Sequence, residues 1–149
     1  MAIFGDIDGI VEGREFASRE LVRLARLHRY QRGGISSAEA EGADAIVLSG
    51  GYEDDEDHGD VIIYTGQGGN DNGKQIRDQT RTRGNLALAR NQQYGLPVRV
   101  IRGHTHISDW SPPAGYRYSG LYYVEEHWHG RGKSGYLVYR YRLAKDTTT

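Results

Sequence analysis

The chain of 149 residues contains no cysteine, and this absence excludes two classes of small protein. Without cysteine the fold cannot depend on disulfide bonds, and no zinc site built from thiolates can form. No apolar run approaches the roughly 18 residues that cross a membrane, so we expect no membrane partner. The first ten residues are acidic and contain no apolar run long enough for a signal peptide, so we expect a cytoplasmic protein.

Phenylalanine and tryptophan are scarce, with two of each, whereas tyrosine occurs 11 times. Tyrosine combines a flat ring with a polar tip, which suits surfaces that stack on a ligand. The length is typical of one domain, and 37% hydrophobic and 26% charged residues are ordinary values for a globular protein.

The net charge is only −1, but the charges are segregated along the chain. Residues 53–60 hold six acidic and no basic side chains, whereas residues 74–102 hold seven Lys or Arg and one acid. A strongly basic segment can present a basic face in a protein of neutral total charge. The distribution is therefore compatible with nucleic-acid binding, and equally with two solvated loops.

Short strands dominate the expected secondary structure. Residues 44–49, 60–65, 97–102, 120–128 and 135–143 are rich in β-branched and aromatic side chains and are separated by glycine-containing turns. Residues 18–28 and 82–91 have apolar side chains at helical spacing, and Ser18 is a suitable N-cap. The pattern predicts an α+β fold, mainly β: a curved, barrel-like sheet with two flanking helices.

The segment of residues 49–69, SGGYEDDEDHGDVIIYTGQGG, carries the clearest candidate site. If its two strands pair across the acidic hairpin, Tyr52, Tyr64 and one carboxylate converge on one cavity. Two tyrosines can sandwich a flat base, and an ionised carboxylate accepts from the amino group of cytosine but cannot donate to O4 of thymine. Backbone at Gly50 and Gly51 can approach such a ligand closely because no Cβ intervenes.

The sequence also allows other interpretations of these residues. Tyr52 and Tyr64 could be ordinary strand aromatics, and the acids a solvated hairpin or a calcium loop, although the spacing fits an EF-hand poorly. Two His-x-His pairs, His104/His106 and His127/His129, could bind a metal. Three functions follow: a reader of modified bases, a metal-dependent nuclease that uses the histidines, or a protein-interaction module that uses the tyrosine-rich strands.

Several blocks of the sequence resemble one family in order and spacing. They are FGDIDG at residues 4–9, GGYEDDEDHGD at 50–60, YTGQGG at 64–69, Asp78-Gln79, NLALARN at 85–91, PVRVIRG at 97–103 and GKSGYLVYRYRL at 132–143. Together they resemble the SRA (SET and RING associated, or YDG) domain of readers of modified cytosine in DNA. The resemblance covers residues 3–143 and leaves 144–149 as a tail or the start of a linker. The name-giving Tyr-Asp-Gly of the family is Tyr118-Ser119-Gly120 here.

The resemblance implies a PUA-like curved β-barrel that binds double-stranded DNA and flips 5-methylcytosine or 5-hydroxymethylcytosine out of the duplex. It also implies that the domain uses no cofactor and no metal and has no catalytic activity of its own. Tyr52 and Tyr64 would stack on the base and Asp55 would bind its amino group. The remaining wall positions are Ser49, Gly50, Gly51, Thr65, Gly66 and Gln67. Gln67 occupies the position near the C5 substituent, where the animal members have a small serine.

The resemblance also implies two loops that enter the duplex. The first contains Gln31, Arg32 and Gly33, with Arg32 as the wedge; the second contains Asn70, Asn72 and Lys74 and lacks the Asn-Lys-Arg finger of the animal readers. The candidates for phosphate contact are Lys74, Arg77, Arg81, Arg83 and Arg102. In bacteria such domains accompany a nuclease in modification-dependent restriction enzymes, so we expect a bacterial protein with a nuclease domain C-terminal to this one.

Overall fold

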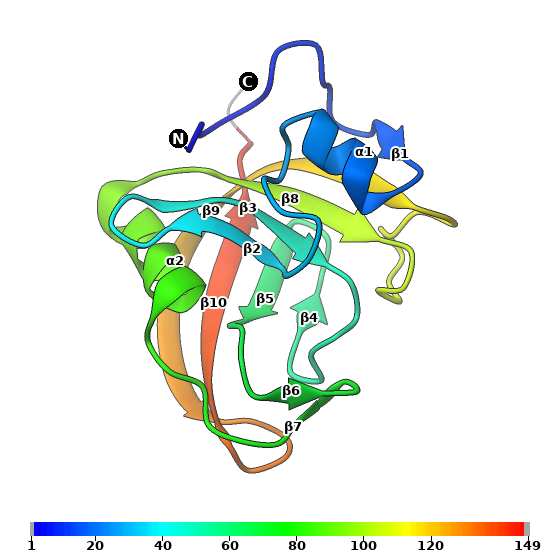
Figure 1. Ribbon diagram of the computed structural model, residues 1–149. Helices are drawn as coiled ribbons and strands as arrows, with labels where there is room; N and C mark the ends of the chain where they lie inside the picture. The colour runs from blue at the N-terminus through cyan, green and yellow to red at the C-terminus, as the bar shows by residue number, and fades with distance from the viewer. Residues whose placement is uncertain (1, 148–149) are drawn as a thin grey trace.

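The computed structural model describes residues 2–147 and consists of one curved sheet with two helices and a small hairpin (Figure 1). Eight strands form the sheet, in the order β2-β3-β8-β9-β10-β5-β4, with β1 paired to β9. The short strands are β1 (Glu15–Phe16), β2 (Ile35–Ala38), β4 (Glu56–Asp57) and β5 (Val61–Thr65). The longer strands are β3 (Gly42–Leu48), β8 (Val98–Gly103), β9 (Tyr116–Arg131) and β10 (Leu137–Lys145).

The sheet bends strongly but does not close into a barrel, because its end strands β2 and β4 are not paired with each other. Register shifts interrupt the β9–β10 ladder at Arg142/Leu143 and the β8–β9 ladder between Arg99 and Ile101. Such irregularities bend a strand and increase its twist. The expected mainly β, curved fold with two flanking helices is therefore confirmed, as an open sheet.

Strand β3 is buried along its whole length because the sheet is covered on both faces here. Ile46 and Leu48 belong to the main core, which also contains Leu88 of helix α2 (Arg83–Tyr94). Ala45 and Val47 pack into a second core that contains Val22 of helix α1 (Arg19–Leu24). A strand buried on both faces is expected to be a continuous apolar run, which explains the sequence of residues 45–48.

The two helices differ from their expected lengths for local reasons. Helix α1 has the expected N-cap, Ser18, whose side chain accepts from the backbone N–H of Leu21. It ends at Leu24, before the expected residue 28, because Arg26 adopts a left-handed conformation with φ of 67°. Helix α2 continues to Tyr94 and ends at Gly95, also left-handed, as is common at helix C-termini.

One expectation about the strands is wrong. Residues 44–49 and 60–65 do not pair with each other: β3 lies between β2 and β8, whereas β5 lies between β10 and β4. The second expected insertion loop, residues 70–75, is a short hairpin of β6 (Asn70–Asp71) and β7 (Lys74–Gln75). Its turn, Asn72-Gly73, has positive φ at both residues, which an Asn-Gly pair adopts readily.

Among residues 2–147 there is no helix whose length and apolar character would let it cross a membrane. Of the expected tail at residues 144–149, Ala144 and Lys145 belong to β10, and residues 148 and 149 lie outside the described residues.

Candidate functional site

The candidate base pocket begins where β3 ends. Ser49 and Gly50 leave the sheet there, and Gly50 has φ of 79°. A Cβ at Gly50 would lie 2.5 Å from the carbonyl oxygen of Thr105, so only glycine fits beside that turn. A Cβ at Gly51 would meet nothing within 4 Å. The backbone at Gly51 therefore borders open space, as expected for a wall that a ligand approaches.

Although β3 and β5 are not paired, the structure does bring Tyr52, Asp55 and Tyr64 together. Tyr52 is half-buried, and its hydroxyl accepts a hydrogen bond from the backbone N–H of Gly68 at 3.0 Å. Tyr64 is only 3% exposed, and its hydroxyl donates to the carbonyl of Val47 at 3.3 Å. Burial, and then the negative charge of Asp55, raise the pKa of Tyr64 well above its usual value. In this structure the Tyr64 ring therefore belongs to the main core and has almost no face open to solvent.

Asp55 is the electrostatic centre of the site. Its carboxylate accepts from the backbone N–H of Thr65 at 2.7 Å. Burial raises the pKa of the Asp55 carboxyl to about 6, and hydrogen bonding from Thr65 opposes that rise only in part. The Thr65 hydroxyl is buried and forms no hydrogen bond of good geometry within residues 2–147. One carboxylate and one hydroxyl therefore lie side by side next to the two tyrosines.

The glycine-rich segment after β5 is held by side chains from outside it. The Asn85 amide pairs with the backbone of Gln67 in both directions, at 2.8 and 3.0 Å, and Gln79 donates to the carbonyl of Gly66 at 2.6 Å. A Cβ at Gly66 would lie 2.5 Å from the Asn85 side chain, so this position requires glycine. The Gln67 side chain lies beside Gly84, at the start of α2.

The acidic residues 53–57 do not form a solvated hairpin, because most of them have fixed partners. Glu53 accepts from the Ser134 hydroxyl at 2.6 Å and from the backbone N–H of Gln75 at 3.0 Å. Asp54 accepts from the backbone N–H of Lys133 at 2.9 Å. The β9–β10 turn and the β6–β7 hairpin thus hold the segment that carries Tyr52 and Asp55.

The first candidate insertion loop, residues 31–34, is anchored at its base. Arg19 donates to the carbonyls of Tyr30 and Gly33 at 2.8 and 3.0 Å. Gln31, Arg32 and Gly33 are exposed, and Gly33 has φ of 79°. Arg32 lines a cavity of about 370 Å³ together with Gln67 and Arg83. Gly34, at the end of the loop, lies against the Tyr64 hydroxyl, so this loop and the candidate base pocket are in direct contact.

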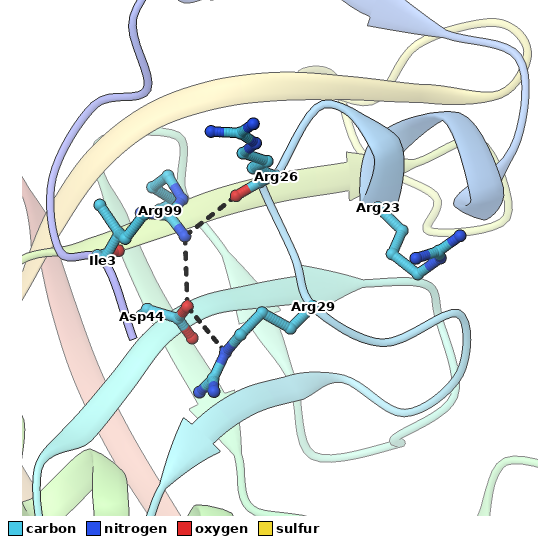
Figure 2. A pocket seen from close by; sticks show the side chains of 6 residues that line it. All are labelled: Ile3, Arg23, Arg26, Arg29, Asp44 and Arg99. Atoms are coloured by element: carbon cyan, nitrogen blue, oxygen red, sulfur yellow. Dashed lines mark hydrogen bonds and ion pairs between the residues drawn. The ribbon is translucent and has the colours of Figure 1, made fainter. Parts of the chain in front are cut away.

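Arg29, which precedes this loop, lines an arginine-rich cavity of about 230 Å³ (Figure 2). Asp44 on β3 binds two guanidinium groups there, Arg29 at 3.2 Å and Arg99 at 3.3 Å. Arg99 further donates to the carbonyls of Leu27 and Gly5, at 2.9 and 2.8 Å, so it fixes both the N-terminal segment and the chain leading to the loop.

The second insertion element is the β6–β7 hairpin, and its residues differ in freedom. The Asn70 side chain donates to the carbonyl of Gly51 and accepts from the backbone N–H of Gly73 at 3.2 Å. Asn70 is therefore a structural link between the pocket wall and the hairpin. Asn72 at the tip and Lys74 are exposed.

The basic candidates divide into two groups. Lys74, Arg77, Arg81 and Arg83 are exposed, and their side chains make no hydrogen bond or ion pair within the described part of the chain. Arg102 is only 3% exposed and donates to both carboxylate oxygens of Asp57 at 2.8 Å. The expected phosphate contact of Arg102 is therefore withdrawn, because its guanidinium is buried in an ion pair.

The histidine pairs do not assemble into a metal site. His106 binds Asp57 at 2.8 Å, His104 faces the carbonyl of Gly115 at 3.2 Å, and His127 contacts Gln92. Among residues 2–147 no group of three or more His, Asp or Glu side chains is placed to hold a metal ion. The metal-dependent nuclease alternative is therefore not favoured.

The sequence did not predict the residues that hold the segments of the site in place without lining it. Asp57, Arg102 and His106 are far apart in the sequence, and nothing in their local spacing predicts that they meet. Asn85 and Gln79 lie in blocks that resemble the family, but their role as clamps of the glycine-rich segment follows only from the three-dimensional structure. The one available signal was the presence of two arginines, Arg99 and Arg102, in a strand of otherwise apolar residues, because an arginine buried with such a strand requires a partner.

Comparison with known proteins gives concordant results. A model of the SAD/SRA domain family matches residues 3–148. The histone-lysine N-methyltransferase, H3 lysine-9 specific SUVH4 of Arabidopsis thaliana is 43% identical over 157 residues, which cover 96% of this chain and 25% of that protein. The chain thus spans about a quarter of the length of this curated relative.

Among solved structures, a modification-dependent restriction endonuclease, TagI, superposes with a TM-score of 0.93 at 48% identity, covering 97% of this chain and 53% of that chain. The SRA domain of SUVH5 has been solved with methylated CHH DNA, with a TM-score of 0.83 at 39% identity. The same domain bound to fully hydroxymethylated CG DNA gives a TM-score of 0.84 at 39% identity. Both SUVH5 structures cover 99% of this chain and 96% of their own.

Proposed function

Because the chain belongs to the SAD/SRA domain family, we propose that it binds double-stranded DNA containing a modified cytosine and flips that base into a pocket formed by Tyr52, Asp55 and Tyr64. The proposal draws support from the SUVH5 SRA domain, which is similar over 99% of this chain and was solved with methylated and with hydroxymethylated DNA. Reading a whole base edge requires the base to leave the stack, at a cost of a few kcal/mol.

The observation that carries the proposal is a half-buried carboxylate with a raised pKa beside two tyrosines. Asp55 is buried enough for its pKa to rise to about 6, yet at neutral pH it is mostly ionised. An ionised carboxylate in such a place accepts a short, charge-assisted hydrogen bond from the cytosine amino group. Thymine offers the acceptor O4 at the same position, so the carboxylate would face another acceptor and gain no donor beyond the Thr65 N–H. The pocket therefore selects cytosine over thymine.

The remaining polar atoms suit the other acceptors of the base. The Thr65 hydroxyl is buried next to Asp55, and the backbone at Gly51 borders open space. Both can serve the ring nitrogen and carbonyl oxygen of cytosine, which are acceptors on the same edge. Gln67, near the expected position of the C5 substituent, is longer than the serine of animal members, and we assign to it the choice between a methyl and a hydroxymethyl group.

In this proposal the contacts to the DNA backbone do not depend on the base sequence. Lys74, Arg77, Arg81 and Arg83 are exposed and free of internal partners among the described residues, so they can bind phosphates. Arg32 and the Asn72 tip lie on exposed turns at which side chains can enter the duplex. Phosphate contacts position the protein, whereas the pocket supplies selectivity.

For the whole protein, we propose a modification-dependent restriction enzyme in which this domain recognises DNA and another segment cleaves it. The support is the similarity to the TagI restriction endonuclease, of which this chain covers 53%. The domain itself is proposed to bind without catalysis. Incubation of DNA with the domain and Mg²⁺, Mn²⁺ or Zn²⁺ should leave the DNA intact.

The test is a binding panel of otherwise identical duplexes that carry cytosine, 5-methylcytosine or 5-hydroxymethylcytosine on one or both strands. We expect tighter binding of at least one modified duplex, with a difference that persists as salt is raised, because the pocket contact is not a phosphate contact. Equal affinity for modified and plain duplexes at every salt concentration would refute the proposal.

A further inference from the structure

Asp57 on β4 is the most strongly bound carboxylate near the candidate pocket. One oxygen accepts from the Arg102 Nη2 at 2.8 Å and from the backbone N–H of Gly59 at 3.0 Å. The other oxygen accepts from the Arg102 Nε and the His106 Nε2, both at 2.8 Å. The carboxylate side chain is only 3% exposed. Four hydrogen bonds thus fix this carboxylate away from solvent.

Burial alone would raise the pKa of Asp57, but the hydrogen bonds from His106 and Arg102 hold it far below its usual range. The group is therefore ionised at every physiological pH. A buried charge of this kind is stable only while its partners stay in place, so the positions of β4 and the strand β8 that carries Arg102 are coupled.

The turn after β8 holds the candidate pocket segment at both ends. At the first end, the Thr105 hydroxyl donates to the carbonyl of Ser49 at 2.7 Å, and the Thr105 carbonyl packs against Gly50. At the other end, His106 binds Asp57. Residues 49–57, which include Tyr52 and Asp55, are thus fastened to one short turn that itself touches neither tyrosine in any described hydrogen bond.

The strand that carries Asp57 also places Asp55 beside Tyr64. Strand β4 pairs with β5 through Glu56 with Ile63 and Asp57 with Ile62, so the next residues outward on the two strands are Asp55 and Tyr64. If β4 shifted, the hydrogen bond from Asp55 to the Thr65 backbone would move with it. The ion pair at Asp57 is therefore in a position to control the distance between the carboxylate and the ring.

We propose that His106 and Asp57 are positioning residues for base recognition: with Arg102 they fix the segment that presents Asp55 and Tyr52 to the flipped base. The inference rests on the proposed function and deepens it. Neither side chain needs to touch the base. Recognition of one amino group requires the accepting carboxylate to stay within a few tenths of an ångström, which side chains on a loop achieve only with such supporting contacts.

A different role for His106 must be separated from this one. Burial raises the pKa of the Asp55 carboxyl, the hydrogen bonds from Thr65 lower it, and the nearby charges of His106 and of Arg140 on β10 lower it further. His106 could then act through its charge rather than through its bond to Asp57. A glutamine at this position keeps an N–H donor near the Nε2 site but carries no charge, so it distinguishes the two roles.

The experiment compares three substitutions in the domain with a matched control. His106→Leu removes the donor, His106→Gln keeps it, and Asp57→Asn removes the acceptor charge. His104→Leu is the control, because His104 lies on the same turn and its ring hydrogen-bonds to the carbonyl of Gly115 and not to Asp57. The readout is the ratio of affinities for the preferred modified duplex and the plain duplex, measured well below the melting temperature of each variant.

We expect His106→Leu and Asp57→Asn to lower this ratio by about tenfold, the effect of one weakened charge-assisted hydrogen bond, with plain-duplex affinity unchanged. His106→Gln and His104→Leu should match the wild type. An unchanged ratio in His106→Leu would overturn the proposal, even if Asp57→Asn fails to fold. An equal loss in His106→Gln and His106→Leu would assign the effect to charge and also overturn it. If the wild type itself shows no preference, the proposed function fails first.

Discussion

The carboxylate of Asp55 accepts a hydrogen bond from the backbone N–H of Thr65 at 2.7 Å, immediately after Tyr64 in the sequence. This bond joins the acidic segment to the strand that carries the buried tyrosine, so the charge and the ring occupy one site. Burial raises the pKa of this carboxyl to about 6, which means that its environment opposes the charge that the proposed function needs. A hydrogen-bond donor on a bound ligand would stabilise the ionised carboxylate of Asp55.

Replacing Asp55 with alanine should abolish the preference for modified cytosine while plain-duplex binding persists. The reason is that only Asp55 accepts from the amino group in our proposal, whereas the phosphate contacts come from other segments. Titration of both duplexes with wild type and variant provides the measurement. Full discrimination by the variant would show that the pocket is elsewhere.

Replacing Asp55 with asparagine should also make the stability less dependent on pH. The folded-state pKa of about 6 lies above the ordinary value of 3.8, so the folded state binds the proton more tightly than the unfolded state. The contribution of this group to stability is therefore fully present below about pH 4 and is lost as pH rises through about 6. Relative to wild type, Asp55→Asn should gain up to about 3 kcal/mol between those limits. Urea unfolding at several pH values measures this, and a constant difference would contradict the buried-carboxyl assignment.

Truncating the tyrosines should weaken binding of modified DNA by roughly 1–3 kcal/mol each, the usual loss for one base stack. Tyr52→Ala is the cleaner test, because Tyr64 is almost fully buried and its removal also affects the core. Tyr52→Phe keeps the ring and loses only the bond from the Gly68 N–H, so it should bind nearly as well as wild type. Comparable losses for Ala and Phe would point to the hydroxyl and reject stacking.

Local patterns were sufficient to predict much of the fold. Alternating apolar residues in β8 and β10, the Ser18 cap and the short strands all reflect interactions with near neighbours, and the structure confirms them. Strand partners were not predictable in this way. The sequence interpretation paired residues 44–49 with residues 60–65 as a hairpin. In the structure β3 instead pairs in parallel with β8, which lies about 50 residues later in the chain. Parallel pairing leaves no turn signal in the sequence.

The candidate site shows the same division. Tyr52, Asp55 and Tyr64 lie in one segment, and their convergence could be inferred from it even though the inferred pairing was wrong. The partners of Asp57 could not be inferred, because Arg102 and His106 lie 45 and 49 residues further along the chain. Arg102 was predicted to bind phosphate from its charge alone. The structure shows that it is buried and binds Asp57 instead.

The exposed basic residues should account for the salt dependence of binding. Neutralising a true phosphate contact among Lys74, Arg77, Arg81 and Arg83 should weaken plain and modified duplexes alike, and reduce the slope of log affinity against log salt by about one. Glutamine or alanine substitution with titrations at several salt concentrations measures both effects. An unchanged slope in all four variants would remove this segment from the interface.

The last prediction concerns the gap that a flipped base leaves in the duplex. An unfilled gap loses stacking on both sides, so a side chain is expected to enter it. Arg32 is our choice, because it is exposed, has no partner within residues 2–147 and precedes Gly33, whose positive φ turns the loop. A planar guanidinium can fill the gap and bind O6 and N7 of the unpaired guanine.

A 2-aminopurine placed next to the target base reports flipping by its fluorescence. Arg32→Ala should reduce this signal more than it reduces affinity, because the phosphate contacts remain.

Gln31→Ala tests the neighbouring residue, and Arg26→Ala serves as the control, since Arg26 is also exposed but lines the separate arginine-rich cavity. If signal and affinity fall in proportion in Arg32→Ala, Arg32 binds the backbone. If Gln31→Ala alone loses the signal, the wedge is Gln31. If neither variant loses the signal, residues 31–33 do not fill the gap, and the Asn72 tip of the β6–β7 hairpin is the next candidate.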